Sequence, residues 1–165
     1  MGEFPLHISN EPSFNEDLGL VMAVFESGHS VELSATGYSM FPTFSPGVRV
    51  VVRAVSRGER LVKGDVVVCL DNGIGQDIFV MHRLVEIKCT ENGEIFYITR
   101  GDSRPEVDRP WNERRVVGVV SGQKTKHGLR RVKSFVPGRM RLGFNRMMLW
   151  VYWKLMRLTS LMFRV

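Results

Sequence analysis

The sequence predicts a mostly β domain, an antiparallel coiled sheet or barrel, with one short helix before it and one amphipathic helix after it. Three observations support this fold class. Short β-branched segments recur closely from residue 30 to 121, glycine-containing turns separate them, and no helical periodicity interrupts them. With 165 residues, of which 44% are apolar and 24% charged, the chain has the composition of one globular domain with appended elements.

Residues 1–29 are expected to contain a helix that packs on this domain. Ser13 and Glu16 fit a capping box, and Gly28 can provide the left-handed stop. The helix is too short to cross a bilayer, and the first residues lack the pattern of a secretory signal. We therefore expect a cytoplasmic protein that can lie at the membrane periphery. The apolar stripe of the helix consists of Leu18, Val21, Met22 and Phe25.

The next part of the chain reads as a series of short strands joined by turns. The Asn72-Gly73 step is a strong hairpin signal, and residues 91–94 form a second turn candidate. The absence of helical patterns between the strands favours antiparallel neighbours. The expected strands are 31–36, 48–53, 66–70, 78–81, 84–87, 95–98 and 115–120.

Ser39 is the candidate nucleophile, in a short turn between a β-rich segment and Pro42. A serine hydroxyl needs a base, a group that orients the base, and donors for the developing oxyanion. Downstream, His82 ends an apolar segment, and Asp102 and Asp108 follow the next one. The order Ser, His, Asp suits nucleophilic hydrolysis. The ordinary pKa of a histidine side chain is about 6.5, so its neutral form is present near neutral pH and can accept the serine proton.

Each of these residues also has a structural interpretation. A serine beside a proline is common in turns, and a strand histidine can simply be half-buried. Asp102 can form an Asx turn after Gly101. The catalytic interpretation therefore depends on the combination of residues.

The combination resembles the type I signal peptidase and SOS-repressor group of serine proteases, over residues 30–121. The nucleophile box of that group, G-x-S-M-x-P-T, is similar to Gly37-Tyr38-Ser39-Met40-Phe41-Pro42-Thr43. The two strands that follow it resemble residues 47–52 and 63–68. The base box is similar to His82-Arg83-Leu84-Val85, and the fourth box to Thr99-Arg100-Gly101-Asp102.

The resemblance implies a serine endopeptidase that cleaves an extended segment of a protein or precursor peptide. A histidine base, where the bacterial enzymes use lysine, is the pattern of the archaeal and endoplasmic-reticulum branch. It implies Ser39 as nucleophile, His82 as general base and Asp108, six residues beyond the Gly-Asp box, as the orienting carboxylate. Asp102 is then a supporting or competing acid. The chain departs from the group at Gly37, where a hydroxyl residue is common, and has no spanning helix just before the serine.

The residues around Ser39 are expected to hold the oxyanion and the substrate. With glycine at position 37, the oxyanion donors are expected to be the backbone N–H groups of Tyr38 and Ser39, in a turn stiffened by Pro42. Met40 is expected to form an apolar rim with Phe41 and Phe44, although core packing is an alternative for these three. The strand at 31–36 offers an edge on which an extended peptide can pair.

The basic charge of the protein is confined to its last third. Residues 1–113 contain 10 Lys/Arg and all 17 Asp/Glu, whereas residues 114–165 contain 13 Lys/Arg and no acidic residue. Residues 122–138 are expected to be a basic linker and 139–165 a basic amphipathic helix, in which Arg146, Lys154, Arg157 and Arg164 share one face within about 80° on a helical projection. The tryptophans and methionines favour an anionic membrane surface as partner. Docking on the protease domain or on another protein is the alternative, and nucleic acid fits less well.

No metal site or cofactor is expected. The histidines His7, His29, His82 and His127 have no ligand spacing, and the two cysteines suggest no disulfide framework. Two functions of other classes remain open: a non-catalytic peptide-binding module, and a self-cleaving regulator of the SOS-repressor kind.

Overall fold

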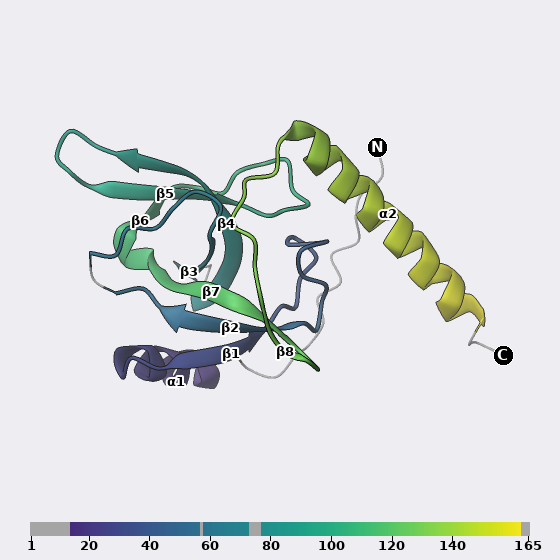
Figure 1. The fold of residues 1–165 in the computed structure, drawn as a ribbon, viewed down its shortest axis with the longest axis horizontal. Coiled ribbons are helices and arrows are strands. Elements are labelled where there is room, and N and C mark those ends of the chain that lie inside the picture. Colours follow the sequence, from purple (N-terminus) through teal and green to yellow (C-terminus); the bar gives the residue numbers. More distant parts are fainter. Residues whose placement is uncertain (1–13, 57, 73–76, 163–165) are drawn as a thin grey trace.

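The computed structural model describes residues 14–56, 58–72 and 77–162 and contains one antiparallel sheet and two α-helices (Figure 1). The mostly β fold class is confirmed. The helices are α1 (Phe14–Glu26) and α2 (Arg139–Met162), and a 3₁₀ turn, η1, covers Glu113–Arg115. The eight strands are β1 (Ser30–Ser34), β2 (Arg49–Ala54), β3 (Val66–Asn72), β4 (Asp77–Cys89), β5 (Ile95–Arg100), β6 (Trp111–Asn112), β7 (Val116–Thr125) and β8 (Gly128–Arg131).

The sheet is open at both ends. Its strand order is β1-β2-β7-β3-β4-β5-β6, and β8 pairs with the second half of β7, where β3 has ended. Of the two forms expected from the sequence, a closed barrel is not made by the described strands. Register shifts at Val51/Val52, Val68/Cys69 and Leu84/Glu86 bend the sheet, because a bulge increases the local twist.

Strand β3 lies between two apolar clusters, one on each face of the sheet. Val66 and Val68 point into the first cluster, and Val67 and Cys69 point into the second. Alternate side chains of a strand face opposite sides, so a strand covered on both sides must be apolar throughout. This explains the unbroken apolar segment in the sequence of β3.

The C-terminal end of α1 is fixed as the sequence predicts. Gly28 has φ 77°, the N–H of His29 donates to the carbonyl of Val24 (3.1 Å), and the N–H of Gly28 donates to that of Phe25 (3.0 Å). This is the Schellman pattern, which glycine adopts without strain. The Phe25 ring closes the first cluster. The predicted capping residue, Ser13, lies outside the described residues.

Three parts of the fold differ from the expectation. Residues 78–81 and 84–87 belong to one strand, β4, and the two-residue strand β6 was not predicted. Residues 122–138 were expected to be a linker, but β7 continues through Thr125 and forms a hairpin with β8. This hairpin has no apolar alternation, because the β8 side chains are exposed. Its signal is Gly128, whose φ of 115° allows the tight turn.

Within the residues that the structure describes, no helix is both long enough and apolar enough to cross a bilayer.

Truncation of the core at Leu84 tests the two-sided packing of the sheet. The Leu84 side chain is completely buried in the second cluster, so Leu84→Ala should lower the free energy of unfolding by about 2–5 kcal/mol in urea denaturation. The matched control, Leu129→Ala, removes the same atoms from an exposed position in β8 and should change stability by less than about 0.5 kcal/mol. Equal effects of the two substitutions would contradict this packing.

Candidate active site

The turn after β1 holds Ser39 shortly before two residues that are anchored in the core. Met40 and Phe44 are buried in the first cluster, with 3% and 1% of their surface exposed. The N–H of Phe41 donates to the carbonyl of Tyr38, and the N–H of Phe44 donates to that of Met40, both at 3.0 Å. Because apolar side chains on its C-terminal side are locked into the core, the Ser39 backbone has little freedom to move.

Residues 101–103 hold this turn from the other side. The Ser103 N–H donates to the Ser39 carbonyl (2.9 Å), and the Ser103 hydroxyl contacts the carbonyls of Tyr38 (2.9 Å) and Ser39 (3.0 Å). A Cβ atom at Gly101 would lie 2.6 Å from the Ser39 carbonyl oxygen. Glycine is therefore required at position 101, because any side chain would push the serine turn away.

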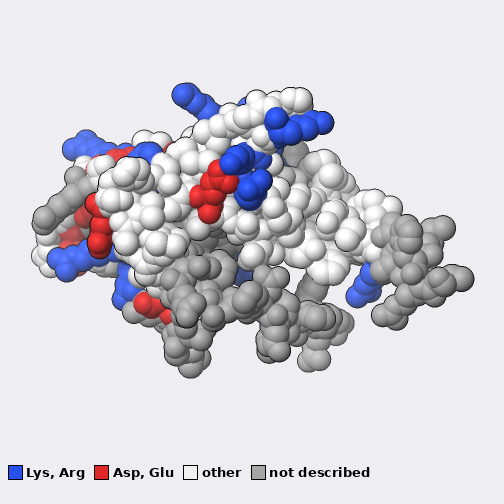
Figure 2. All heavy atoms as spheres, turned by 90° about the horizontal axis from the view of Figure 1, so that it is seen from below, with Lys and Arg blue, Asp and Glu red and all other residues white. Residues whose placement is uncertain are grey.

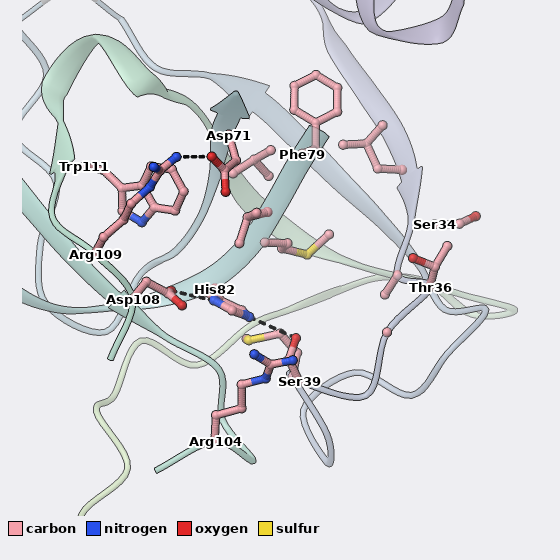
Figure 3. Close-up of a pocket in the computed structure, with 17 residues that line it drawn as sticks. Ser34, Thr36, Ser39, Asp71, Phe79, His82, Arg104, Asp108, Arg109 and Trp111 are labelled. Atoms are coloured by element: carbon pink, nitrogen blue, oxygen red, sulfur yellow. Dashed lines mark hydrogen bonds and ion pairs between the residues drawn. The ribbon is translucent and has the colours of Figure 1, made fainter. Parts of the chain in front are cut away.

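The His82 imidazole lies between Ser39 and Asp108 (Figure 3). Its Nε2 is 2.9 Å from the Ser39 Oγ, and its Nδ1 is 2.6 Å from the Asp108 Oδ2. An ionised carboxylate only accepts hydrogen bonds, so Nδ1 carries the proton and Nε2 is left to accept one from the serine hydroxyl. The His82 side chain is 8% exposed. Residues from three distant parts of the sequence thus form one hydrogen-bonded chain in the order a hydrolase needs.

Asp108 lies in the loop between β5 and β6, which folds back against β5 and so places the carboxylate beside the imidazole. The Asp108 N–H donates to the Thr99 carbonyl (2.8 Å), and the Thr99 hydroxyl donates to Asp108 Oδ2 (2.5 Å). The Trp111 indole N–H in turn donates to the Thr99 hydroxyl (2.8 Å). The carboxylate is therefore positioned by a second layer of hydrogen bonds that does not touch the imidazole.

These contacts keep Asp108 ionised. Burial acts to raise the pKa of the Asp108 carboxyl, but hydrogen bonds from His82 and Thr99 and the nearby positive charge of Arg104 lower it further than burial raises it. The pKa of Asp108 therefore lies below its usual range. An ionised carboxylate at this position favours the Nδ1–H tautomer of His82 and would stabilise its imidazolium form.

Asp102 makes a different contact. The Arg83 Nε donates to Asp102 Oδ1 and Nη2 donates to Oδ2, both at 2.7 Å, and the Thr43 hydroxyl also donates to Oδ2. Both charged side chains are buried. Of the two candidate acids, Asp108 contacts the imidazole, and Asp102 is occupied by the guanidinium.

The sheet register explains this division. His82 is opposite Val67 and lies on the face of the second cluster, together with Leu84, whose partner is Thr99. Arg83 is the next residue in the strand, so its side chain points to the other face. The two aspartates are therefore bound on opposite sides of β4.

Arg83 also joins distant segments. Its Nη1 donates to the carbonyls of Gly64 (2.7 Å) and Lys133 (3.0 Å), and its guanidinium lies 4.9 Å from the centre of the Phe135 ring. This network fixes the path of the chain after β8, which leads to α2.

A cleft of about 460 Å³ opens at the Ser39 hydroxyl. One wall is formed by residues 33–37 and the other by residues 79–82 of β4. Figure 3 shows Arg104 beside Ser39 and the Asp71–Arg109 ion pair farther along the cleft. Both walls are strand edges: β1 pairs only with β2 among the described strands, and β4 pairs with β5 only from Arg83 onward.

The predicted binding residues have different positions. Met40 lines the cleft and also packs in the core. The Tyr38 ring packs against Trp153 of α2, with 5.0 Å between ring centroids. Pro42 does not line this cleft and lies instead in a separate groove beside Arg130. Phe44 packs in the core, so core packing applies to it.

Five contributors to the site have no predicted role. Thr99, Arg83 and Thr43 stand inside the segments that resemble known boxes, and strand alternation next to His82 was a usable signal for Arg83. Trp111 and Asn145 had no local signal, because their contacts cross between elements far apart in the sequence.

Searches with the sequence find no matching model of a known protein family and no matching curated protein. The chemistry of the site therefore has to follow from its geometry.

The buried ion pair between Arg83 and Asp102 can be tested with a double-mutant cycle. Arg83→Met leaves a buried carboxylate without its partner and should lower the free energy of unfolding by about 3–5 kcal/mol. Adding Asp102→Leu removes that stranded charge, so the double variant should be more stable than Arg83→Met alone. Additive losses in chemical denaturation would contradict the pairing.

The lowered pKa of Asp108 predicts an acid-dependent contribution to stability. Its folded-state pKa lies below the unfolded value of about 3.9, so ionisation stabilises the fold above that pH, and the contribution is lost as the pH falls through the folded pKa. The difference in unfolding free energy between the wild type and Asp108→Asn should be smaller below about pH 4 than at about pH 5. A difference that grows on acidification would show that the carboxyl pKa is raised instead.

Proposed function

We propose that this protein is a serine endopeptidase, similar to signal peptidases, which hydrolyses a peptide bond in an extended segment of a protein or precursor peptide. One observation carries the proposal: the hydrogen-bonded chain from Ser39 through His82 to Asp108, ending in a cleft. Neither a turn serine nor a half-buried strand histidine requires this arrangement. The proposal assigns Ser39 as nucleophile, His82 as general base and Asp108 as the group that orients the imidazole.

Acylation would begin with attack of the Ser39 Oγ on the carbonyl carbon of the scissile bond. The hydroxyl proton moves to His82 Nε2, which is 2.9 Å away, as the new C–O bond forms. The imidazolium is stabilised by the Asp108 carboxylate at 2.6 Å. When the tetrahedral intermediate collapses, the C–N bond breaks and Nε2 gives its proton to the leaving amine.

Deacylation repeats these steps with water. Water loses a proton to His82 Nε2 and attacks the Ser39 ester, and the ester C–O bond breaks as the proton returns to the Ser39 Oγ. The products are two peptides with a new carboxyl and a new amino terminus. The reaction needs no cofactor.

The oxyanion is assigned to the backbone N–H of Ser39, with that of Tyr38 as a second donor. The carbonyl of Tyr38 accepts hydrogen bonds from Ser103 and Phe41. Since the N–H and C=O of a trans peptide point in opposite directions, the Ser39 N–H points away from Ser103. A donor fixed in this way costs no reorganisation during the reaction.

The two strand edges of the cleft favour an extended substrate. A peptide backbone placed between β1 and the first half of β4 can form hydrogen bonds on both sides, with alternate side chains entering the cleft. Met40 and Phe79 offer apolar surface there, and the Arg104 side chain adds a positive charge next to the serine. Recognition would therefore depend mainly on backbone conformation and on side chains close to the scissile bond.

A fluorophosphonate probe tests the proposal. It should label the wild type on Ser39, and Ser39→Ala should abolish labelling, because only a serine activated by a base reacts with such a reagent. The matched control is Ser34→Ala, which removes another hydroxyl from the cleft lining and should be labelled like the wild type. Mass spectrometry of the tryptic peptides identifies the labelled residue. An unlabelled Ser39 in the folded protein would sink the proposal and favour a peptide-binding module.

A further inference from the structure

Helix α2 stands apart from the sheet, with the serine turn between the two (Figure 1). Among the side chains of α2 that the structure describes, residues 140–157, only a narrow stripe is buried or half-buried. Asn145 donates to the backbone carbonyl of Asp102 (2.8 Å), and Tyr152 packs against Phe41, with 5.5 Å between ring centroids. The stripe consists of Leu142, Asn145, Leu149 and Tyr152.

A second stripe on the helix is apolar and points away from the sheet. It is turned about 140° around the helix axis from the docked stripe and is about 23 Å long. Its members are between 39% and 91% exposed. A continuous apolar surface of this kind on a folded domain marks an interaction site. The outward stripe consists of Met140, Phe144, Met147, Val151 and Leu155.

Positive charges flank the outward stripe. Lys154 lies on one side of it and Arg141 on the other, and Arg146 lies farther around the helix. The sequence contains no acidic residue after Glu113. Figure 2 agrees: on the face it shows, the described acidic side chains lie over the sheet, and none is visible on the end that carries α2.

Aromatic side chains stand at the border between the apolar and charged surfaces. Trp150 is 58% exposed, and the Lys154 ammonium lies 4.4 Å from the centre of its ring. Tryptophan is favoured where an apolar phase meets water, since the indole combines an apolar body with an N–H donor.

From these features we infer that α2 binds the surface of an anionic lipid bilayer through its outward stripe. The apolar side chains would enter the acyl boundary while the lysine and arginines contact the lipid phosphates. A second copy of the chain fits the stripe less well, because it would bring the same cations to the contact without acidic residues on either helix.

Lipid binding by α2 would also affect the candidate active site, because the docked side of the helix lies next to the serine turn. The Tyr38 ring, next to Ser39, lies 5.0 Å from Trp153 and 6.0 Å from Tyr152 between ring centroids. A bilayer bound to the outer side of α2 would therefore hold the serine turn close to the lipid surface. The inference goes beyond the proposed hydrolysis, because lipid binding requires no reactive serine.

Co-sedimentation with vesicles tests it. The full chain carrying Ser39→Ala should bind vesicles rich in phosphatidylglycerol and bind pure phosphatidylcholine vesicles roughly tenfold or more weakly. Replacing Phe144, Val151 and Leu155 together by glutamate should abolish the binding. The control introduces glutamate at Val62 and Leu129, which are 56% and 52% exposed on the sheet domain, and should bind like the parent. Circular dichroism checks that each variant is folded.

Tryptophan fluorescence gives a readout that needs no change in the stripe. Brominated lipids in anionic vesicles should quench the exposed Trp150 and leave the buried Trp111 unquenched. Trp153 packs on Tyr38 on the side of α2 that faces the serine turn, so Trp150→Phe should remove most of the quenching. Equal binding to neutral vesicles, undiminished binding of the glutamate variant, or no binding would overturn the inference. So would a concentration-dependent dimer that the same glutamates dissociate, since a second copy would then cover the stripe. Because Ser39→Ala is used, none of these outcomes bears on hydrolysis.

Discussion

The buried ion pair between Arg83 and Asp102 is the interaction on which the rest of the site depends. It removes Asp102 from the reach of His82, so that the imidazole has a single carboxylate partner. It also fixes the segment from Gly101 to Ser103, whose donors hold the Ser39 carbonyl. A buried pair of this kind adds little net stability, because desolvation of both charges offsets their attraction. Its effect here is positional, since it determines where each neighbouring segment can lie.

Alternate residues of β4 face opposite sides of the sheet. The groups around His82 and the groups around Arg83 therefore form two separate layers. His82 and Arg83 are adjacent, so one faces the cleft side and the other faces the segments that support it. On the first side, Thr99 and Trp111 hold Asp108 against the imidazole. On the other side, the Arg83 guanidinium donates hydrogen bonds to the backbone carbonyls of Gly64 and Lys133. Strand β4 thus positions both the reactive groups and the residues that support them. Helix α2 contacts both layers, one through Tyr38 and the other through the Asp102 carbonyl.

The sequence was sufficient for the fold class, because the apolar segments are short, β-branched and separated by clear turns. It also selected Ser39, His82 and Asp108, which the structure brings within hydrogen-bonding distance. It could not assign Asp102, since a buried arginine partner is visible only once the register of β4 is known. Residues 122–131 read as a linker because an exposed hairpin needs no apolar alternation. The position of Pro42 in a separate groove was not visible in the sequence either, because the direction of a turn depends on the core residues that anchor it, here Met40 and Phe44.

Helix α2 and the cleft are separate features that share one contact, the serine turn, and the proposal made for each can be tested alone. The central claim is that Ser39, His82 and Asp108 act together to break amide bonds. The most direct measurement is turnover: a mixture of unstructured peptides is incubated with the wild type or with Ser39→Ala, and new termini are followed by mass spectrometry. The claim predicts cleavage by the wild type that falls by about 10³-fold or more in the variant. New termini appearing at the same rate with both proteins would contradict it.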